Sequence, residues 1–384
     1  MFNCKARILP QAACLLKRSS STQEPEVIFE AINNAGIITL NRPKVLNSVN
    51  KSVLSKMLHQ MYDWENTKCL VIIKGAGDKA FCPGGDIIQA IDRVHGPIMF
   101  AVGYNVTNYI KKYKIPYVAL IHGFAMGGGL GISVHGKYRV ATEKTIIAMP
   151  EVKIGFSPDA GGSYFLPRLQ DNLGIYLGLT GNRLKGQDVA KVGIATHFVS
   201  SQSLPDLEKA LSKCTSDGDI QNSSWAIMGA PDYHGRPRFL NEPVGEFSLA
   251  LNMKHIKYCF AASTVEEIIQ RLEKIQTDWS VKTIKTLHEM CPGSLKITLL
   301  SLQRGAKMEL AECLKMEYRI TCHLIENHNF PEGVRALLID KDNKPQWKPR
   351  TLAEVDDKYV ESFFEKLPDD KELKFFDMGQ KNPF

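Results

Sequence analysis

The sequence predicts an α/β core of stacked ββα turns, followed by a mainly helical C-terminal region. Through about residue 200, pairs of strand-like segments alternate with segments of helical period, as in folds that stack such units. From Ser201 onward the strand pattern is lost. Four later segments have the period of amphipathic helices: 264–275, 281–290, 294–306 and 310–325. A stretch rich in Asp, Gly, Ser and Asn, residues 215–224, separates the two parts.

The 384 residues divide into four predicted segments. These are a mitochondrial transit peptide (1–23), the α/β core (24–215), the helical region (216–350) and a C-terminal tail (351–384). The leader holds four basic residues and several serines but no acid, and it lacks the compact apolar stretch of a secretory signal. This composition predicts import into the mitochondrial matrix.

Charge and hydropathy argue against two kinds of partner. The net charge is +7, and without the four basic residues of the leader it is +3, too small for a polyanion-binding surface. No apolar run is long enough to span a bilayer. We therefore predict no nucleic-acid partner and no membrane partner. The nine cysteines show neither a CxxC pair nor metal-ligand spacing, so no metal site is predicted.

The core begins with a hairpin and a helix. Two strand-like segments, 27–31 and 36–40, flank a polar break and predict paired strands. Between residues 54 and 61 apolar side chains recur at helical spacing, with Asn50 or Ser52 as the N-cap.

Buried strands and further helices follow. Segments 69–75 and 117–121 are continuous apolar runs, as expected of strands covered on both faces. A helix is predicted between them, from about residue 97 to 113, and a second helix from the glycines at 127 through 134. Two more strands complete the core, at 139–142 and 145–149.

Three segments are rich in glycine, and two of them also carry acidic side chains. KAFCPGGDI (79–87) ends a strand in two glycines, and HGFAMGGGLGISVHG (122–136) places three glycines between a strand and a helix. AMPEVKIGFSPDAGGSYFLPRL (148–169) carries Glu151 and Asp159. Glycine lets backbone N–H groups approach a ligand oxygen, above all at a helix N-terminus. Tight turns and close packing are the alternative explanation of such glycines, but the three segments taken together favour a ligand site.

In these motifs the chain resembles the crotonase superfamily, whose members hold a CoA thioester carbonyl between two backbone N–H groups. The resemblance places these donors at Gly85 and Gly128, where fixed dipoles meet the charge that develops on the oxygen. It implies the crotonase spiral fold and an acyl-CoA substrate. It also implies no cofactor, since CoA is part of the substrate, and it is compatible with a homo-oligomer.

One branch of the superfamily is especially similar. The segment 148–169 and the later motifs SLKIT (294–298) and EGVRALLIDKDNKPQWKP (332–349) resemble members that hydrolyse a short hydroxyacyl-CoA in mitochondrial valine breakdown. The likeness extends from about Val27 to Pro349, which is nearly all of the chain after the leader.

The carboxylates separate hydrolysis from hydration. Hydratases of the superfamily use two glutamates on one water, and the first of these matches Gly131 here. Glu151 matches the catalytic glutamate, which would attack the thioester or act as general base on a water. Asp159 matches the second catalytic acid, which would position the 3-hydroxyl of the substrate or assist the leaving thiolate.

Three positions depart from the family pattern, and one of them, Pro83, stands where Ala is common in the oxyanion turn. Members usually carry an active-site Glu directly before a tyrosine, and here Gly103 precedes Tyr104, so we count Gly103 among the substrate-binding positions. Ser157 stands where an aromatic residue or His is common. These departures bear on the acyl specificity and the rate.

The predicted function is hydrolysis of a short 3-hydroxyacyl-CoA thioester, most closely 3-hydroxyisobutyryl-CoA. Two rivals stay open: another crotonase-type reaction such as double-bond isomerisation, and a non-catalytic hydrolase-like subunit, as found in some mitochondrial ribosomes. The retention of both Glu151 and Asp159 favours the enzyme.

Overall fold

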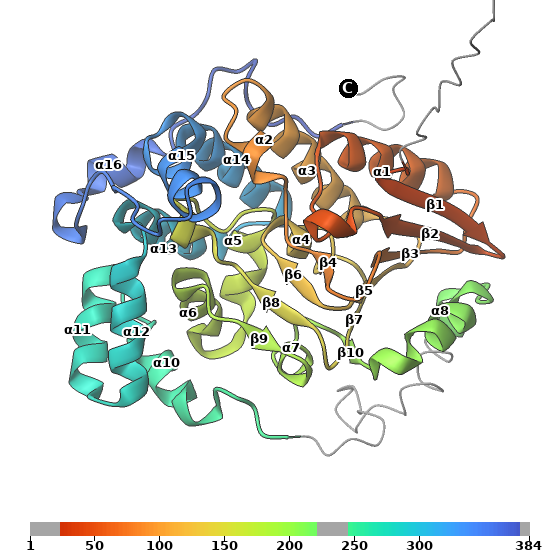
Figure 1. Ribbon diagram of the computed structural model, residues 1–384, viewed down its shortest axis with the longest axis horizontal. Helices are drawn as coiled ribbons and strands as arrows, with labels where there is room; N and C mark the ends of the chain where they lie inside the picture. Colours follow the sequence, from red (N-terminus) through yellow and green to blue (C-terminus); the bar gives the residue numbers. More distant parts are fainter. Residues whose placement is uncertain (1–23, 221–244, 377–384) are drawn as a thin grey trace, which may run out of the picture.

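The computed structural model describes residues 24–220 and 245–376 (Figure 1). The predicted transit peptide, residues 221–224 of the predicted boundary and residues 377–384 of the predicted tail lie outside this part. Within it the strands form two sheets, one of six strands and one of four.

The six-stranded sheet has the order β1-β2-β3-β5-β7-β10. The first two strands are the predicted antiparallel hairpin, and every later pair is parallel. The strands are β1 (Val27–Ile32), β2 (Ala35–Leu40), β3 (Leu70–Gly75), β5 (Tyr117–Ile121), β7 (Tyr138–Ala141) and β10 (His197–Phe198).

The four-stranded sheet has the order β4-β6-β8-β9, with the first three strands parallel and the last antiparallel. Its members are β4 (Ala80–Cys82), β6 (Phe124–Met126), β8 (Ile146–Ala148) and β9 (Leu184–Lys185). Three times in succession the chain runs from a strand of the first sheet to a strand of the second and then into helical segments. This arrangement confirms the predicted core of stacked ββα turns.

Short and long helices alternate with these strands. In the core they are α1 (Lys51–Trp64), α2 (Ile87–Ala90), α3 (His95–Lys112), α4 (Gly128–Gly131), α5 (Gly162–Phe165), α6 (Leu173–Thr180), α7 (Gln187–Lys191) and α8 (Leu204–Ser212). Of the two predicted caps of α1, Asn50 is the one used, because its side chain accepts a 2.8 Å hydrogen bond from the Val53 N–H.

Helix α4 is shorter than predicted and ends at Gly131 instead of residue 134. After it the chain continues in turns, since the Ser133 and Val134 N–H groups both donate to the Leu130 carbonyl and the Gly136 N–H donates to the Ser133 carbonyl. Glycine-rich sequence favours this early end, because glycine is a poor helix former.

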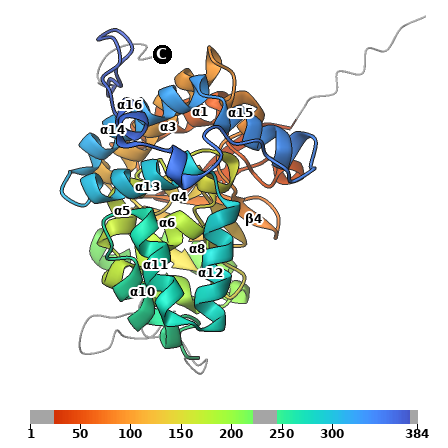
Figure 2. The same cartoon turned by 90° about the vertical axis from the view of Figure 1, so that its left-hand side faces the viewer.

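Only helices and loops occur in residues 245–376, as predicted for the second part. The helices are α10 (Met253–Cys259), α11 (Val265–Ile275), α12 (Asp278–Glu289), α13 (Pro292–Gly305), α14 (Leu310–Glu326), α15 (Asn329–Val334) and α16 (Asp357–Ser362). Figure 2 shows α10, α11 and α12 grouped at one end of the molecule, whereas α14 packs against α3 of the core.

The segment predicted as a tail is partly tied to the core. Leu373 is buried, and the Asn105 side chain of α3 donates to the Lys374 carbonyl over 3.1 Å and accepts from the Phe376 N–H over 2.7 Å. These contacts place the chain after α16 against helix α3.

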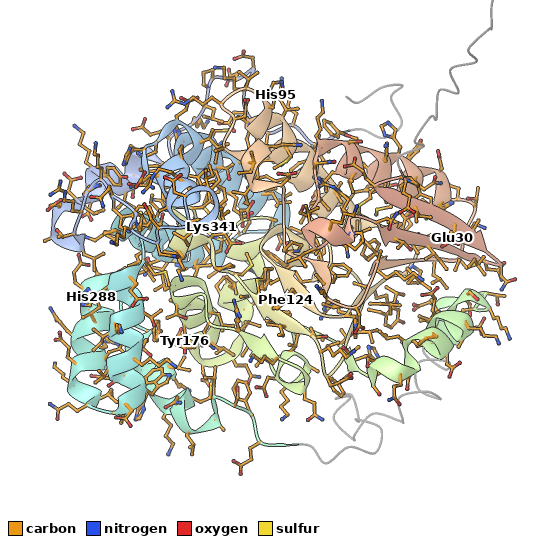
Figure 3. The ribbon with its side chains drawn as sticks, in the orientation of Figure 1. Glu30, His95, Phe124, Tyr176, His288 and Lys341 are labelled. Atoms are coloured by element: carbon orange, nitrogen blue, oxygen red, sulfur yellow. The ribbon has the colours of Figure 1, made fainter. Side chains whose placement is uncertain are left out.

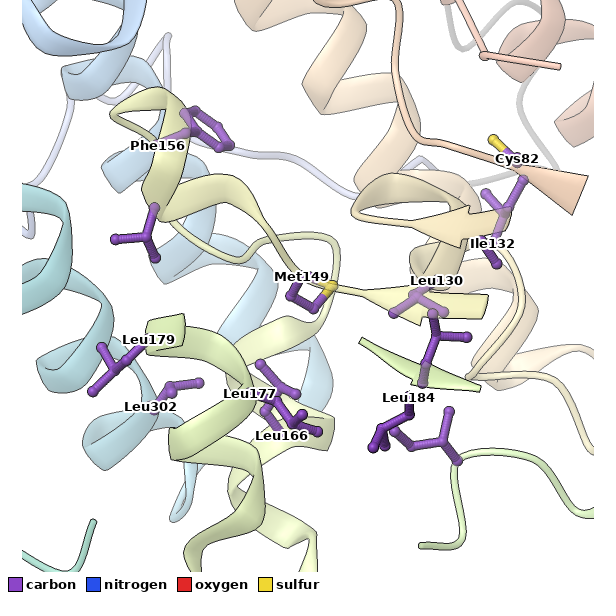
Figure 4. Packing of buried hydrophobic residues seen from close by; sticks show 14 of the residues in the cluster. Cys82, Leu130, Ile132, Met149, Phe156, Leu166, Leu177, Leu179, Leu184 and Leu302 are labelled. Atoms are coloured by element: carbon purple, nitrogen blue, oxygen red, sulfur yellow. The ribbon is translucent and has the colours of Figure 1, made fainter. Parts of the chain in front are cut away.

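One large hydrophobic core joins both parts of the chain. Figure 4 shows part of it, where Leu166 lies beside Leu177 of α6, and Leu302 of α13 lies beside Leu179. Figure 3 shows Phe124, the first residue of β6, near the middle of the molecule. No helix among the described residues is long and apolar enough to cross a membrane.

Candidate active site

The predicted site segments all follow strands of the four-stranded sheet. Gly84 and Gly85 come after β4, Gly128 begins α4 after β6, and Glu151 comes shortly after β8. Because β4, β6 and β8 are parallel neighbours, their carboxyl ends meet at one edge of the sheet. Ligand sites of α/β proteins commonly form at such an edge.

A cavity of about 480 Å³ opens at this edge, within the size range of small-molecule sites. Its wall includes all five positions predicted from the sequence: Gly85, Gly103, Gly128, Glu151 and Asp159. Most of the remaining wall is apolar and is contributed by Val49, Leu54, Ile87, Met99, Phe100, Ile132, Phe156 and Phe330. The structure therefore brings together the five predicted positions, which are up to 74 residues apart in sequence, from Gly85 to Asp159.

The two predicted N–H donors belong to segments that lie close together. A Cβ placed on Gly128 would lie 3.6 Å from the Gly85 nitrogen, and one placed on Gly84 would lie 3.4 Å from the Gly128 nitrogen. The β-bridge to Val49 uses the Gly84 carbonyl and the Asp86 N–H, which leaves the Gly85 N–H unused. Gly128 is the first residue of its helix, and no acceptor within the described chain pairs with its N–H either.

Glu151 lies directly beside the segment of Gly128. It is 6% exposed, and its Oε2 atom has no hydrogen-bond partner among the described residues. A Cβ on Gly127 would lie only 2.5 Å from Oε1, and Gly127 also has a φ of +49°, so both space and backbone conformation require glycine there. Burial, and secondarily the charge of Asp159, raise the pKa of Glu151 well above its usual value.

Asp159 is held by a chain of hydroxyl groups. The Tyr104 hydroxyl of α3 donates to Oδ2 over 2.8 Å and lies 2.8 Å from Oγ1 of Thr321 in α14. Since the tyrosine proton is used on Asp159, Thr321 donates to the tyrosine oxygen. Burial raises the pKa of Asp159 to about 6, and the hydrogen bond from Tyr104 opposes that rise.

Glu317 of α14 fixes the loop that carries Asp159. Its carboxylate accepts hydrogen bonds of 2.8 Å from the Gly161 and Ser163 N–H groups and one of 2.5 Å from the Ser163 hydroxyl. These donors belong to the first turn of α5, where a carboxylate satisfies N–H groups that have no helical partner. Burial raises the pKa of Glu317 to about 8, while the Ser163 and Gly161 hydrogen bonds lower it.

Three further positions clarify the chemistry. A Cβ on Gly131 would lie 2.5 Å from the Ala160 Cβ, so this position has no room for the glutamate of a hydratase. Gly103 lines the cavity, and a Cβ there would meet only Leu54, at 3.6 Å. Ser157 is buried against Thr298, 3.1 Å between the hydroxyls, and is not part of the cavity wall.

Two cations form part of the cavity wall at the surface. Lys153 and Arg183 are exposed, and within the described residues neither forms an ion pair. Their position suits the phosphates of an anionic ligand whose other end enters the cavity. Across residues 24–220 and 245–376, no cluster of three or more His, Cys, Asp or Glu side chains is arranged to hold a metal ion.

Sequence reasoning missed three residues that support Asp159: Tyr104 as its hydrogen-bond donor, and Thr321 and Glu317 on α14. The last two lie four positions apart and so share one face of that helix. The helix was predicted, but no local pattern marks which of its polar residues turn inward.

The fold and the arrangement of the site are those of a class of enzymes that act on CoA thioesters. The family model described as enoyl-CoA hydratase/isomerase matches residues 35–364, and the chain belongs to this family. The predicted membership of the crotonase superfamily is thereby confirmed.

Individual relatives are similar over almost their whole length. The chain is 44% identical to 3-hydroxyisobutyryl-CoA hydrolase, mitochondrial, of Danio rerio over 95% of this chain and 97% of the relative. It is 45% identical to the Homo sapiens protein of the same name, over 91% of each chain. Among solved structures, a carnitinyl-CoA dehydratase from Mycobacterium thermoresistibile is similar with a TM-score of 0.82 at 32% identity, covering 92% of this chain and 99% of that chain.

Proposed function

We propose that this protein hydrolyses 3-hydroxyisobutyryl-CoA to 3-hydroxyisobutyrate and CoA. The observation that carries the proposal is that one cavity holds a buried Glu151 oxygen and the backbone N–H groups of Gly85 and Gly128, none of which has a hydrogen-bond partner among the described residues. The name shared by the Danio rerio and Homo sapiens relatives supports this acyl group.

In the proposed reaction, the Gly85 and Gly128 N–H groups bind the thioester oxygen and stabilise the negative charge that develops there. Glu151 either attacks the thioester carbon to form an anhydride, which water then cleaves, or removes a proton from a water that attacks the carbon. In both routes the carbon–sulfur bond breaks and the CoA thiolate takes up a proton. Asp159 accepts a hydrogen bond from the 3-hydroxyl of the substrate.

The shape and charge of the cavity fit the two ends of this substrate. The exposed cations Lys153 and Arg183 suit the phosphates of CoA, and the apolar interior suits a short acyl chain. The relatives are named mitochondrial, which supports a mitochondrial protein. We further propose a location in the matrix and a role in valine breakdown.

Gly131 supports hydrolysis over hydration, because its surroundings leave no space for a second glutamate on the same water. The purified protein should therefore release free thiol from 3-hydroxyisobutyryl-CoA, followed with a thiol reagent, and should leave the double bond of crotonyl-CoA unhydrated. Rapid hydration of crotonyl-CoA without thiol release from the hydroxyacyl ester would refute the proposal.

A further inference from the structure

Gly103 lies inside the 18-residue helix α3. Packing does not explain why this position is a glycine. The other glycine of α3, Gly96, is needed because a Cβ there would lie 2.3 Å from the Ala90 carbonyl oxygen. Gly103 has no such neighbour, since its Cβ would meet only the Leu54 Cδ1 atom at 3.6 Å. Glycine destabilises a helix interior relative to alanine. A glycine at a position with room for a larger side chain is therefore an unusual feature.

This space lies between the two ends of the proposed acyl site. Met99, Gly103 and Thr107 are four residues apart and form one face of α3 that lines the cavity. At one end, the Met99 Cε atom would lie 3.2 Å from a Cβ on Gly85, one of the two proposed carbonyl-binding positions. At the other end, the Thr107 hydroxyl approaches Gly131, which packs on Ala160, the neighbour of Asp159.

Gly85, Gly103, Gly128 and Asp159 all line one cavity, so a short acyl chain held there has the open space at Gly103 within the same cavity. If C1 is held at Gly85 and Gly128 and the 3-hydroxyl at Asp159, then C2 is the carbon between these fixed points, and its substituent is free to enter that space. The nearest side chain there is Leu54, and apolar walls select apolar substituents.

We infer that the gap at Gly103 receives the alkyl substituent on C2 of the acyl group and admits substituents larger than methyl, so that 2-alkyl-3-hydroxyacyl-CoA esters are substrates as a class. The inference rests on the proposed function and specifies its substrate range. It makes Gly103 the residue that determines specificity at C2.

The test compares CoA esters of 3-hydroxypropanoate that carry hydrogen, methyl or ethyl at C2. Wild-type protein should hydrolyse the 2-ethyl ester with a kcat/KM within about tenfold of that for the 2-methyl ester. Gly103→Ala adds one methyl group at a position with ordinary contact distances, so the fold should be retained. The variant should lose about 10- to 200-fold in kcat/KM for the 2-ethyl ester and change little for the ester without a C2 substituent.

Gly218→Ala is the matched control, because Gly218 is also helical, has only the Ser216 hydroxyl within reach of a Cβ, at 3.7 Å, and lies outside the cavity wall. It should leave the preference among the three esters unchanged. A straight-chain ester, 3-hydroxyhexanoyl-CoA, tests the alternative that the gap receives carbons beyond C3.

The inference is overturned if wild-type protein rejects the 2-ethyl ester, if Gly103→Ala leaves the ratio of 2-ethyl to unsubstituted ester unchanged, or if the variant affects only the straight-chain ester. Binding of non-hydrolysable thioether analogues, measured by calorimetry, repeats the comparison without turnover. Absence of hydrolysis for every ester would refute the proposed function, while the affinities of the analogues would still decide the role of Gly103.

Discussion

Asp159 is buried, and its single side-chain hydrogen-bond donor within the described chain is the Tyr104 hydroxyl. That hydroxyl in turn lies within hydrogen-bonding distance of Thr321, so the orientation of the carboxyl depends on two side chains from different helices. Burial alone raises the pKa of Asp159, and the tyrosine limits the rise to a value of about 6. The ionised form, which can accept the substrate hydroxyl, is therefore available at neutral pH.

Tyr104→Phe should raise the pKa of Asp159 further, because the variant removes a hydrogen bond that stabilises the charged form. A ¹³C NMR titration of aspartate-labelled protein measures this pKa directly, with the signal assigned by its loss in Asp159→Asn. Tyr109→Phe is the control, since Tyr109 lies on the same helix but not in the cavity wall. An unchanged Asp159 titration in Tyr104→Phe would contradict this role.

The parallel ends of β4, β6 and β8 are the elements that assemble the site. A different feature follows each strand: a turn of two glycines follows β4, helix α4 follows β6, and the carboxyl group of Glu151 follows β8. Their spacing is set by the sheet, so the two N–H groups and Glu151 are placed by backbone hydrogen bonds and need no side-chain contacts between them. Such preorganisation is the main source of oxyanion stabilisation in enzymes.

Gly128→Ala tests this arrangement. The added methyl group would have no protein atom closer than 3.6 Å, so the melting temperature should change little, but it would occupy the space of the bound carbonyl. We expect kcat/KM for 3-hydroxyisobutyryl-CoA to fall by about 10²-fold or more. Gly127→Ala should instead lower the melting temperature, because of its positive φ and its contact with Glu151. Full activity in Gly128→Ala would show that no ligand oxygen binds beside it.

At the scale of the whole molecule, the helical second part completes the site that the strands begin. Glu317 of α14 binds the loop after Asp159, and Thr321 of α14 contacts the Tyr104 hydroxyl that holds Asp159. Phe330 of α15 packs against Phe156, with ring centroids 4.5 Å apart and ring planes inclined at 37°. Three carboxyl groups, those of Glu151, Asp159 and Glu317, are thereby buried close together, and the pKa of each is raised.

This burial predicts a pH dependence of stability. Glu317 has a pKa of about 8 in the folded protein against 4.5 as its ordinary value, so between these values the folded state keeps a proton that the unfolded state has released. The free energy of unfolding therefore decreases as the pH rises through this range, by about 1.4 kcal/mol per pH unit for each such group. Above pH 8 the contribution no longer changes.

Urea unfolding at about pH 6.0, 6.75 and 7.5, all within this range, should detect the effect of Glu317. Glu317→Gln removes the titrating group, so its unfolding free energy should fall less steeply with pH than that of the wild type. The variant should also be less stable overall, since an amide oxygen cannot replace both carboxylate oxygens at Gly161 and Ser163. Parallel pH dependences in the two proteins would contradict the proposed protonation of Glu317.

Short motifs, and the resemblance to the crotonase superfamily that they carry, predicted the parts of the site that depend on backbone and local sequence. Gly85, Gly128, Glu151 and Asp159 stand in recognisable strand-end segments, and all four line the cavity. The contact between Tyr104 and Thr321 joins residues 217 positions apart, and that between Glu317 and Gly161 spans 156 positions. Such contacts arise from packing of α14 on α3 and α5 and leave no periodic signal in the sequence.

The most direct test of the central claim is the turnover of 3-hydroxyisobutyryl-CoA by Glu151→Gln, followed as release of CoA. Glutamine keeps the shape of the side chain but can neither attack the thioester nor remove a proton from water. Its neutral amide also spares the cost of burying a charge, so the variant should fold and melt at or above the wild-type temperature. We predict a kcat lower by about 10²-fold or more. A folded variant that retains kcat within about threefold of the wild type would contradict the assignment of Glu151 as the catalytic residue.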